Sequence, residues 1–214
     1  MRETSLRPTF DDFDESLRTY VYLNSKIASS QRVIQHPWQK RELLEAIVLR
    51  LVTLWEVFVE DVIVGCLSGD CSRYAQFHGV VLREDLSVGE CRAMLTGGGY
   101  LDFRDVGHVQ AVAQQILVVN PFTAIPEASS RKIDELIVMR NYICRYSGRA
   151  ERALAEVYRN YHIQRFREPG SFLWGDARRG GQTRMGAYLD ALRDAASAMR
   201  AALDSLAQQR TVDV

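Results

Sequence analysis

The chain has 214 residues, which is enough to bury one sizeable hydrophobic core. Hydrophobic residues make up 47% of it and charged residues 25%, as in an ordinary soluble globular protein. The formal net charge is zero, which excludes a global attraction to nucleic acid or to a membrane surface.

Charge is unevenly distributed along the chain. Residues 1–130 contain 12 lysines and arginines against 17 acidic residues, whereas residues 131–214 contain 15 against 10. The basic C-terminal part can meet phosphate groups. It can equally pair with the acidic N-terminal part, so charge alone leaves both interpretations open.

Cysteine usage and hydropathy favour the inside of a cell. Four cysteines in a chain of this length do not suggest a disulfide scaffold. The first residues include no apolar signal segment, and charged residues interrupt the longest apolar-rich run, 46–67. We therefore expect a soluble cytoplasmic protein with reduced thiols and no membrane span.

The first 70 residues predict two helices. An apolar stripe over residues 10–30 indicates a first helix, with acidic residues in its first turns, where the helix dipole favours them. Pro37 then precedes a longer helical pattern over residues 38–67. Because this pattern is apolar around most of its circumference, we expect it to be the central helix of a bundle.

The next stretch predicts two short helices and a loop. Residues 71–77 fit one short helix, and Ser87 can cap another that continues through Leu95. Three glycines at 97–99 then break the helical pattern. They do not form a phosphate-binding loop, because no Walker-type lysine follows and the preceding residues are helical.

The last hundred residues predict four more helices. One begins at Asp105 or Gly107 and continues to about Val119, where Asn120-Pro121-Phe122 ends it. The others are predicted over residues 131–148, 149–162 and 182–208, with loops at Pro169-Gly170 and 175–181. With no convincing strand, the whole pattern predicts an all-α, single-domain helical bundle of seven to eight helices.

The segment 131–148 is the most informative of these helices. Ser129 or Ser130 can cap its start, and Gly148 can end it at the C′ position. At about 100° per residue, five side chains share one face that we expect to pack into a core. They are Ile133, Leu136, Ile137, Ile143 and Cys144.

Arg140 falls in the middle of that apolar face. An unpaired buried charge is costly, so either a structural ion pair, a snorkelling side chain or a functional role must explain it. Glu56 and Glu60 interrupt the long central helix, and we expect one of them to orient Arg140. Asn141 adjoins Arg140, and Arg145 follows five residues later, about 140° further round the helix.

The sequence gives little support for a metal-binding site or for a serine or cysteine nucleophile. Cys66, Cys71, His78 and Cys91 are loosely clustered, but none has the CxxC or HxxxH spacing that directs two ligands at one ion. Buried structural cysteine is the favoured interpretation, and we expect neither a metal nor a cofactor. No serine or cysteine lies in a recognisable arrangement with a histidine.

A surface rich in arginine and tyrosine is the remaining candidate for a functional site. Such side chains can hold RNA phosphates and stack on bases, although the same spacing fits a helix with a tyrosine packing face. The residues are Tyr146, Tyr158, Tyr161, Arg149, Arg152, Arg159 and Arg165.

A family resemblance rests on residues 132–154, KIDELIVM followed by RNYICRYSGRAERAL. This segment resembles the signature helix of HEPN domains. These are all-α bundles that often dimerise, and many are metal-independent endoribonucleases of toxin or antiphage systems. Their signature is Arg, commonly Asn, three variable residues and His, and Arg140 and Asn141 match its first two positions.

Four other segments resemble the RiboL-PSP-HEPN type of this family. They are LWEVFVEDVI (54–63), GGGYLDFRDV (97–106), VNPFTAI (119–125) and EPGSFL (168–173). The resemblance covers about residues 40–205. It implies one HEPN-like domain over residues 1–214, with the helix at 10–30 packed on its core.

Arg145 stands where the family has histidine. In active members, two arginines and two histidines of a dimer form one site, and histidine moves the proton of the ribose hydroxyl or of the leaving oxygen. Arginine can hold a phosphate but does not deprotonate. Tyr146 adjoins it, but an unperturbed pKa of about 10 suits neutral pH poorly.

Three interpretations of Arg145 stay open: a degenerate protein that binds RNA or a partner without cutting, a ribonuclease that tolerates the change, and a substitution that inactivates a toxic protein.

The resemblance implies a homodimer through the helix at 131–148, with Arg140, Asn141 and Arg145 lining a shared basic cleft. Arg149, Arg152 and Tyr146 are expected to add RNA contacts. A cognate antitoxin or defence partner is also implied. The alternative function is a non-catalytic RNA- or protein-binding dimerisation module.

Overall fold

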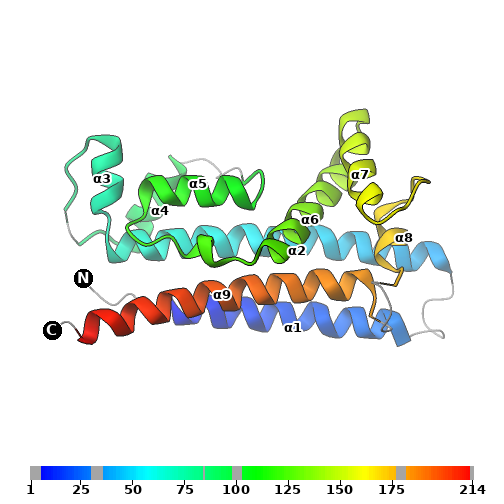
Figure 1. Ribbon diagram of the computed structural model, residues 1–214, viewed down its shortest axis with the longest axis horizontal. Coiled ribbons are helices and arrows are strands. Elements are labelled where there is room, and N and C mark those ends of the chain that lie inside the picture. The colour runs from blue at the N-terminus through cyan, green and yellow to red at the C-terminus, as the bar shows by residue number, and fades with distance from the viewer. Residues whose placement is uncertain (1–5, 30–35, 84, 98–102, 177–181, 213–214) are drawn as a thin grey trace. The chain divides into compact units, whose positions relative to one another are not determined.

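The computed structural model describes residues 6–29, 36–83, 85–97, 103–176 and 182–212. Over these residues the chain forms nine α-helices, one 3-10 helix and no strand (Figure 1). Eight of the nine have seven or more residues, so this part of the chain confirms the predicted all-α fold. The helices are α1 (Arg7–Ser29), α2 (Pro37–Gly69), α3 (Ser72–His78), α4 (Val88–Thr96), α5 (Val106–Ile116), η1 (Pro121–Ala124), α6 (Glu127–Arg145), α7 (Gly148–Asn160), α8 (Pro169–Leu173) and α9 (Arg184–Val212).

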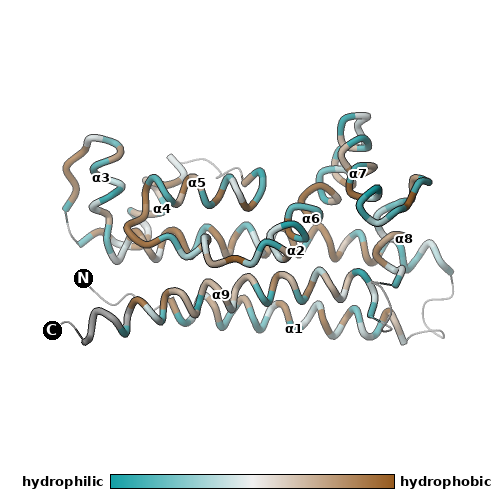
Figure 2. The backbone as a smooth tube through the Cα atoms, viewed as in Figure 1, coloured by the Kyte–Doolittle hydropathy of each residue, from teal (hydrophilic) through white to brown (hydrophobic). Residues whose placement is uncertain are grey.

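The described residues gather into two compact units. The first unit comprises residues 6–13, 55–126 and 194–212, and the second comprises residues 14–54 and 127–193. α1, α2 and α9 each contribute to both units. Figure 2 shows hydrophobic and hydrophilic positions interleaved along the helices, as expected of helices that bury one side. The predicted extent of the HEPN-like domain stays a prediction, and most of the predicted loops at 97–99 and 175–181 lies outside the described residues.

The first unit contains an aromatic cluster between α1 and α2. The rings of Phe10 and Phe13 are buried against Phe58, with centroids 5.1 and 4.1 Å from its ring, and Phe13 also lies 6.1 Å from Trp55. Aromatic pairs of this kind contribute about 0.5–1.5 kcal/mol each beyond the burial of their surface. The start of α1 therefore packs on α2. It begins at Arg7, three residues before the predicted start.

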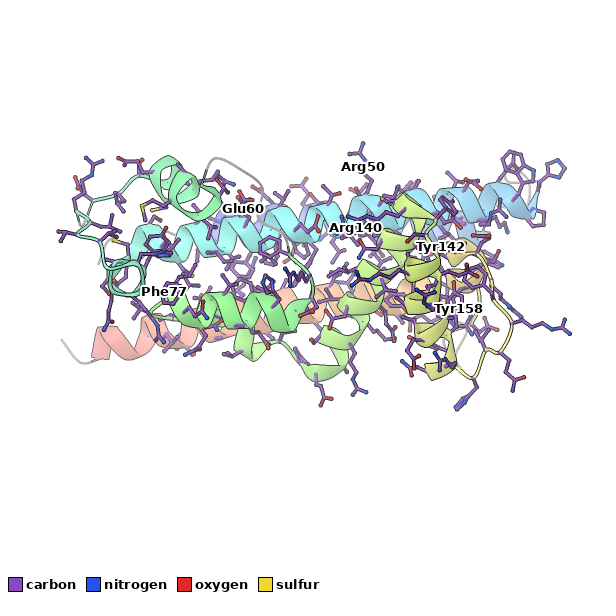
Figure 3. The ribbon with its side chains drawn as sticks, turned by 90° about the horizontal axis from the view of Figure 1, so that it is seen from above. Arg50, Glu60, Phe77, Arg140, Tyr142 and Tyr158 are labelled. Atoms are coloured by element: carbon purple, nitrogen blue, oxygen red, sulfur yellow. The ribbon has the colours of Figure 1, made fainter. Side chains whose placement is uncertain are left out.

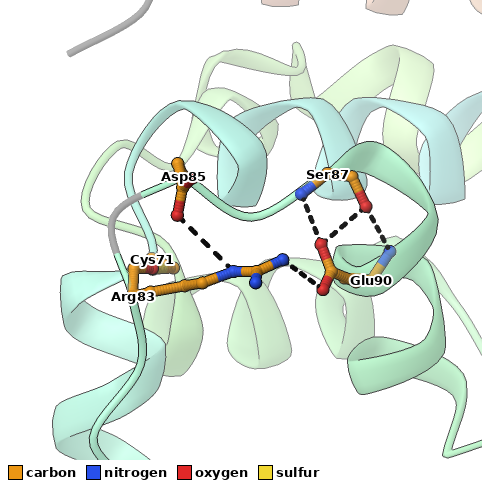
Figure 4. A network of polar contacts seen from close by, with 5 residues as sticks. All are labelled: Cys71, Arg83, Asp85, Ser87 and Glu90. Carbon is orange, nitrogen blue, oxygen red and sulfur yellow. Dashed lines mark hydrogen bonds and ion pairs between the residues drawn. The ribbon is translucent and has the colours of Figure 1, made fainter.

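Ser87 caps α4, as the sequence predicted, and Glu90 completes a capping box that was not predicted. The Ser87 hydroxyl accepts a hydrogen bond from the Glu90 N–H, and the Glu90 carboxylate accepts one from the Ser87 N–H at 2.9 Å (Figure 4). Arg83 donates a hydrogen bond to the Glu90 carboxylate at 2.5 Å and forms an ion pair with Asp85. The Cys71 thiol lies 3.8 Å from the Arg83 carbonyl oxygen. The bonds from Ser87, followed by the bond from Arg83, lower the pKa of Glu90 to about 2.

An arginine of α4 meets the acids of α2 in the same unit. Arg92 donates through one guanidinium nitrogen to Glu60 and through the other to Asp61, the latter at 2.6 Å. Two carboxylates on an otherwise apolar helix are thereby paired with a cation. The pairing fixes the position of α4 on α2.

α5 follows its predicted start but ends early. The Asp105 side chain caps it by accepting the backbone N–H three residues on, at 2.7 Å. The helix ends at Ile116 rather than at Val119. The Asn120 side chain then caps the 3-10 turn η1 by accepting a hydrogen bond from the Phe122 N–H.

The boundaries predicted for the signature helix were wrong at both ends. α6 begins at Glu127, directly after Pro126, so Ser129 is a buried residue inside the helix rather than its cap. It ends at Arg145, and Gly148 is the first residue of α7 rather than a C′ residue. The helix therefore extends four residues further at its start and stops three residues earlier at its end.

The buried face of α6 also differs from the prediction. Cys144 is exposed and Ile143 is half-buried, because they lie in the last turn of the helix. Ile133, Leu136 and Ile137 are buried as predicted. The buried residues are Ser129, Ile133, Leu136, Ile137, Met139 and Tyr142.

The Pro169-Gly170 segment forms the short helix α8 instead of a loop. The Gly170 N–H donates to the buried Glu45 carboxylate of α2 at 3.0 Å. A Cβ atom on Gly170 would lie 2.3 Å from the Arg41 carbonyl oxygen, so only glycine permits this close approach. Contact with α2 in the second unit therefore stabilises a helix in a segment whose local sequence predicts a turn.

We expect Gly170→Ala to lower the free energy of unfolding by roughly 1–3 kcal/mol, because its methyl group overlaps the α2 backbone. Gly148→Ala is the matched control in the same unit, since its Cβ would lie 3.9 Å from the nearest atom, in Arg152. It should change stability by less than about 0.5 kcal/mol. Urea denaturation followed by circular dichroism measures both. Equal midpoints for the two variants would contradict the close packing of α8 on α2.

Candidate functional site

The three motif residues occupy one helix of the second unit but differ in exposure. Arg140 and Asn141 are half-buried on α6, and Arg145 is exposed as its last residue. Arg140 lies between the directions of the buried Leu136 and Ile133 around the helix, in the middle of the apolar face that the sequence predicted. Figure 3 labels Arg140 on α6, two residues before the buried Tyr142.

A short turn brings further predicted residues next to this helix end. Tyr146 and Ser147 alone separate α6 from α7, and the Ser147 hydroxyl caps α7 by accepting the backbone N–H three residues on. Arg149 and Arg152 follow in the first turns of α7, and both are exposed. The turn thus gathers four exposed site residues, counting Arg145 and Tyr146, within eight positions of sequence.

Tyr146 has an uncommon backbone conformation. Its φ angle is +42°, in the left-handed region that glycine and asparagine favour. Its N–H donates to the Tyr142 carbonyl at 2.9 Å, which ends α6 in the αL capping motif. The side chain nevertheless remains 64% exposed. A tyrosine therefore occupies a strained position that glycine would occupy at lower cost.

A run of aromatic rings leads inward from Tyr146. Its ring centroid lies 5.2 Å from Tyr142, and Tyr142 lies 5.4 Å from Phe166. Phe166 lies 5.9 Å from Tyr158, which lies 4.6 Å from Phe172 of α8. Figure 3 shows Tyr142 and Tyr158 on α6 and α7. The run joins the exposed turn to the core of the second unit.

The tyrosines of this run are poor proton-transfer groups. Burial raises the pKa of Tyr146, and Glu45, Glu168 and Glu42 raise it further. Burial also raises the pKa of Tyr142 and of Tyr158, whose hydroxyl donates to a backbone carbonyl at 2.8 Å. These phenols therefore remain protonated at neutral pH, which makes Tyr146 a poor general base there.

The acids near Tyr146 come from α2 and from the residue before α8. Glu45 is 6% exposed, and burial raises its pKa, while the hydrogen bond from Gly170 opposes the rise. Glu42 is exposed and is paired with Arg41 at 2.9 Å. Tyr146 therefore interacts with the carboxylates of Glu45, Glu168 and Glu42, while Arg41, the partner of Glu42, acts on it in the opposite sense.

A second polar cluster, which the sequence did not predict, joins α6, α7 and α9 in the same unit. Both Tyr161 and Tyr188 donate to one Glu135 oxygen, at 2.7 and 2.6 Å, and Lys132 donates to the Tyr161 hydroxyl at 3.1 Å. Burial, assisted by the Glu135 carboxylate, raises the pKa of Tyr161 to about 12. Because Tyr188 is 53 residues from Glu135, no local spacing indicates this cluster.

The predicted orienting acids lie in the first unit, while Arg140 lies in the second. Glu60 pairs with Arg92 of its own unit, and Glu56 is buried. That either acid orients Arg140 stays a prediction.

The described residues contain no group of three or more acidic, histidine or cysteine side chains that could hold a metal ion. Burial raises the pKa of the Cys66 thiol to about 12 and also raises that of Cys91. Burial thus favours the protonated form of both thiols.

Among the described helices, none combines the length and the hydropathy needed to cross a membrane.

No family model, curated protein or solved structure matches the chain. The HEPN resemblance therefore rests on the quoted segments alone.

The environment of Glu45 predicts a pH dependence. Its pKa in the folded state lies above the ordinary value of 4.5, so protonation favours folding. The free energy of unfolding of the wild type relative to Glu45→Gln should rise as pH falls from neutral to 4.5, and then level off. Urea midpoints across this range measure it. Glu42→Gln, one turn away, controls for the lost negative charge, and a difference that falls with decreasing pH would contradict the burial of Glu45.

Proposed function

We propose that the chain is an RNA-directed protein of the HEPN type, related to the metal-independent endoribonucleases of toxin and antiphage systems. It acts as a homodimer through α6, with Arg140, Asn141 and Arg145 facing the same residues of a second copy. An antitoxin or defence partner belongs to the same proposal. The cytoplasm is its proposed location.

The observation that carries this proposal is the exposed arginine surface at the junction of α6 and α7. Seven arginines and three glutamates lie from Arg140 to Glu168, so this stretch is basic in a chain of zero net charge. The exposed arginines are Arg145, Arg149 and Arg152 at the junction, Arg165 and Arg167 on either side of Phe166 in the sequence, and Arg159 in the last turn of α7, where it pairs with Glu156. Arginine forms paired, charge-assisted hydrogen bonds with phosphate oxygens, and a cluster of this density suits a polyanion.

Arg145 sets what this surface does to RNA. A guanidinium at the histidine position adds a phosphate contact and removes a group that moves protons at neutral pH. The raised pKa of the adjacent Tyr146 makes that phenol a still poorer base at neutral pH. These two observations favour the second candidate function, a non-catalytic RNA- or protein-binding dimerisation module of the same family.

Restoring histidine separates the two candidates. Purified wild type and Arg145→His are incubated with total RNA or tRNA in the presence of a chelator, and the products are resolved on denaturing gels. Cleavage by the histidine variant alone is the expected result, because the imidazole supplies the missing proton transfer. Cleavage by both would indicate an enzyme that tolerates the arginine. Binding without cleavage by either would favour the binding module.

RNA binding itself is tested with Arg145→Ala. We expect weaker binding, and the slope of log K against log salt should become shallower by about 0.7 for each single-strand phosphate that the variant no longer neutralises. Arg131→Ala is the matched control, since Arg131 is exposed on the same helix, about 21 Å along the axis, and pairs with Glu127. Equal effects of both variants, or no RNA binding by the wild type, would refute the proposed surface.

The homodimer has a separate test. Light scattering at micromolar concentration should give about twice the chain mass of 24.4 kDa. A mass near that of one chain would refute the dimer, and a shared cleft with it.

A further inference from the structure

Two exposed aromatic rings contact the same buried ring at the candidate site. Tyr146 is 64% exposed and Phe166 is 39% exposed. Both contact Tyr142, with centroid distances of 5.2 and 5.4 Å, and Tyr142 itself is buried. One buried ring thus supports two rings that are both exposed to solvent.

The backbone at Tyr146 gives a second, independent observation. Helix ends of this form favour glycine or asparagine at the left-handed position, because a side chain there is strained. Here the position holds a large aromatic residue at φ +42°, and that residue buries only about a third of its surface. Packing in the fold therefore does not account for the choice of tyrosine. Strain that packing does not explain is a feature of ligand-binding positions.

Charge around these rings favours one kind of ligand. Arg145, Arg149 and Arg152 are exposed on the α6–α7 side, and Arg165 and Arg167 flank Phe166 in sequence. Three acids also act on Tyr146, namely Glu45 and Glu42 of α2 and Glu168 before α8, and Glu42 is paired with Arg41. A ligand at this site therefore carries negative charge toward the arginines and a neutral, flat group over the rings.

We infer that Tyr146 and Phe166 form a stacking site for the unpaired bases of single-stranded RNA, whose phosphates follow the neighbouring arginines. Every base presents a flat face that stacks on an aromatic ring, and the combination of arginines with exposed rings is the general solution for single strands. In a duplex the bases stack on one another and are not free to stack on the two rings, so the rings add no binding energy for a duplex. The inference deepens the proposed function and rests on it.

We expect the site to bind single-stranded RNA more tightly than double-stranded RNA, a preference that arginines alone would not produce. The arginines bind single- and double-stranded RNA through phosphate, whereas the two rings add stacking energy for the single strand only. Loss of a ring should therefore weaken single-strand binding and leave duplex binding unchanged. This selectivity separates a stacking role from a general charge effect.

The test measures fluorescence anisotropy with a labelled RNA of about 10 nucleotides, alone and annealed to its complement. Tyr146→Asn removes the ring and suits the left-handed backbone, so the helix end is kept. Phe166→Leu removes the other ring, and Tyr146→Phe keeps the ring without its hydroxyl. Tyr22→Ala is the matched control, since Tyr22 is 59% exposed on α1.

Tyr146→Asn and Phe166→Leu should each weaken single-strand binding by roughly 5- to 150-fold, with duplex binding, circular dichroism and melting temperature close to those of the wild type. Tyr22→Ala should bind like the wild type, and Tyr146→Phe, which keeps the ring, should bind single strands more tightly than Tyr146→Asn does. Unchanged single-strand affinity in Tyr146→Asn would overturn the stacking site and leave the proposed RNA function intact. A changed mass in light scattering would assign the ring to a protein interface and also overturn it. An absence of RNA binding by the wild type would overturn both.

Discussion

The candidate site depends on the way in which α6 ends. The backbone of Tyr146 enters the left-handed region, and its N–H closes the last turn of α6 on the Tyr142 carbonyl. The chain can therefore reverse within two residues and begin α7 under the Ser147 cap. A longer connection would separate Arg145 from the arginines at the start of α7, and the basic surface would lose its density. One backbone angle thus sets the spacing of the positive charges.

Acidic residues that interrupt apolar helices mark tertiary contacts in both units. In the first unit, Glu60 and Asp61 share the guanidinium of Arg92. In the second, Glu135 accepts hydrogen bonds from two tyrosine hydroxyls, and Glu45 accepts one from the backbone at the start of α8. Burying a carboxylate is costly unless donors meet it, so each of these acids fixes one helix against another. The few acidic residues on apolar helices therefore say more about which helices pack together than the many apolar residues do.

Local signals predicted the helices and several of their ends, because spacing and capping act within a few residues. Ser87 and Asp105 cap the helices that the sequence assigned to them. Gly148 was misinterpreted as a helix end, since a tyrosine at the left-handed position is too rare to expect. Gly170 was assigned to a loop, because its helix is held by a contact across 125 residues that no local pattern contains. The three motif residues were placed on one helix correctly, while the rings and acids that surround them come from distant segments.

The last turn of α6 also carries Cys144, directly before Arg145. It is a free, exposed cysteine, whereas the pKa of the Cys66 and Cys91 thiols is raised by burial. Thiolate is the form that reacts with maleimides, so exposure favours Cys144 over these two for alkylation. A fluorophore or spin label can thus be attached one residue from Arg145. A label on Cys144 would therefore report on the basic surface at the end of α6.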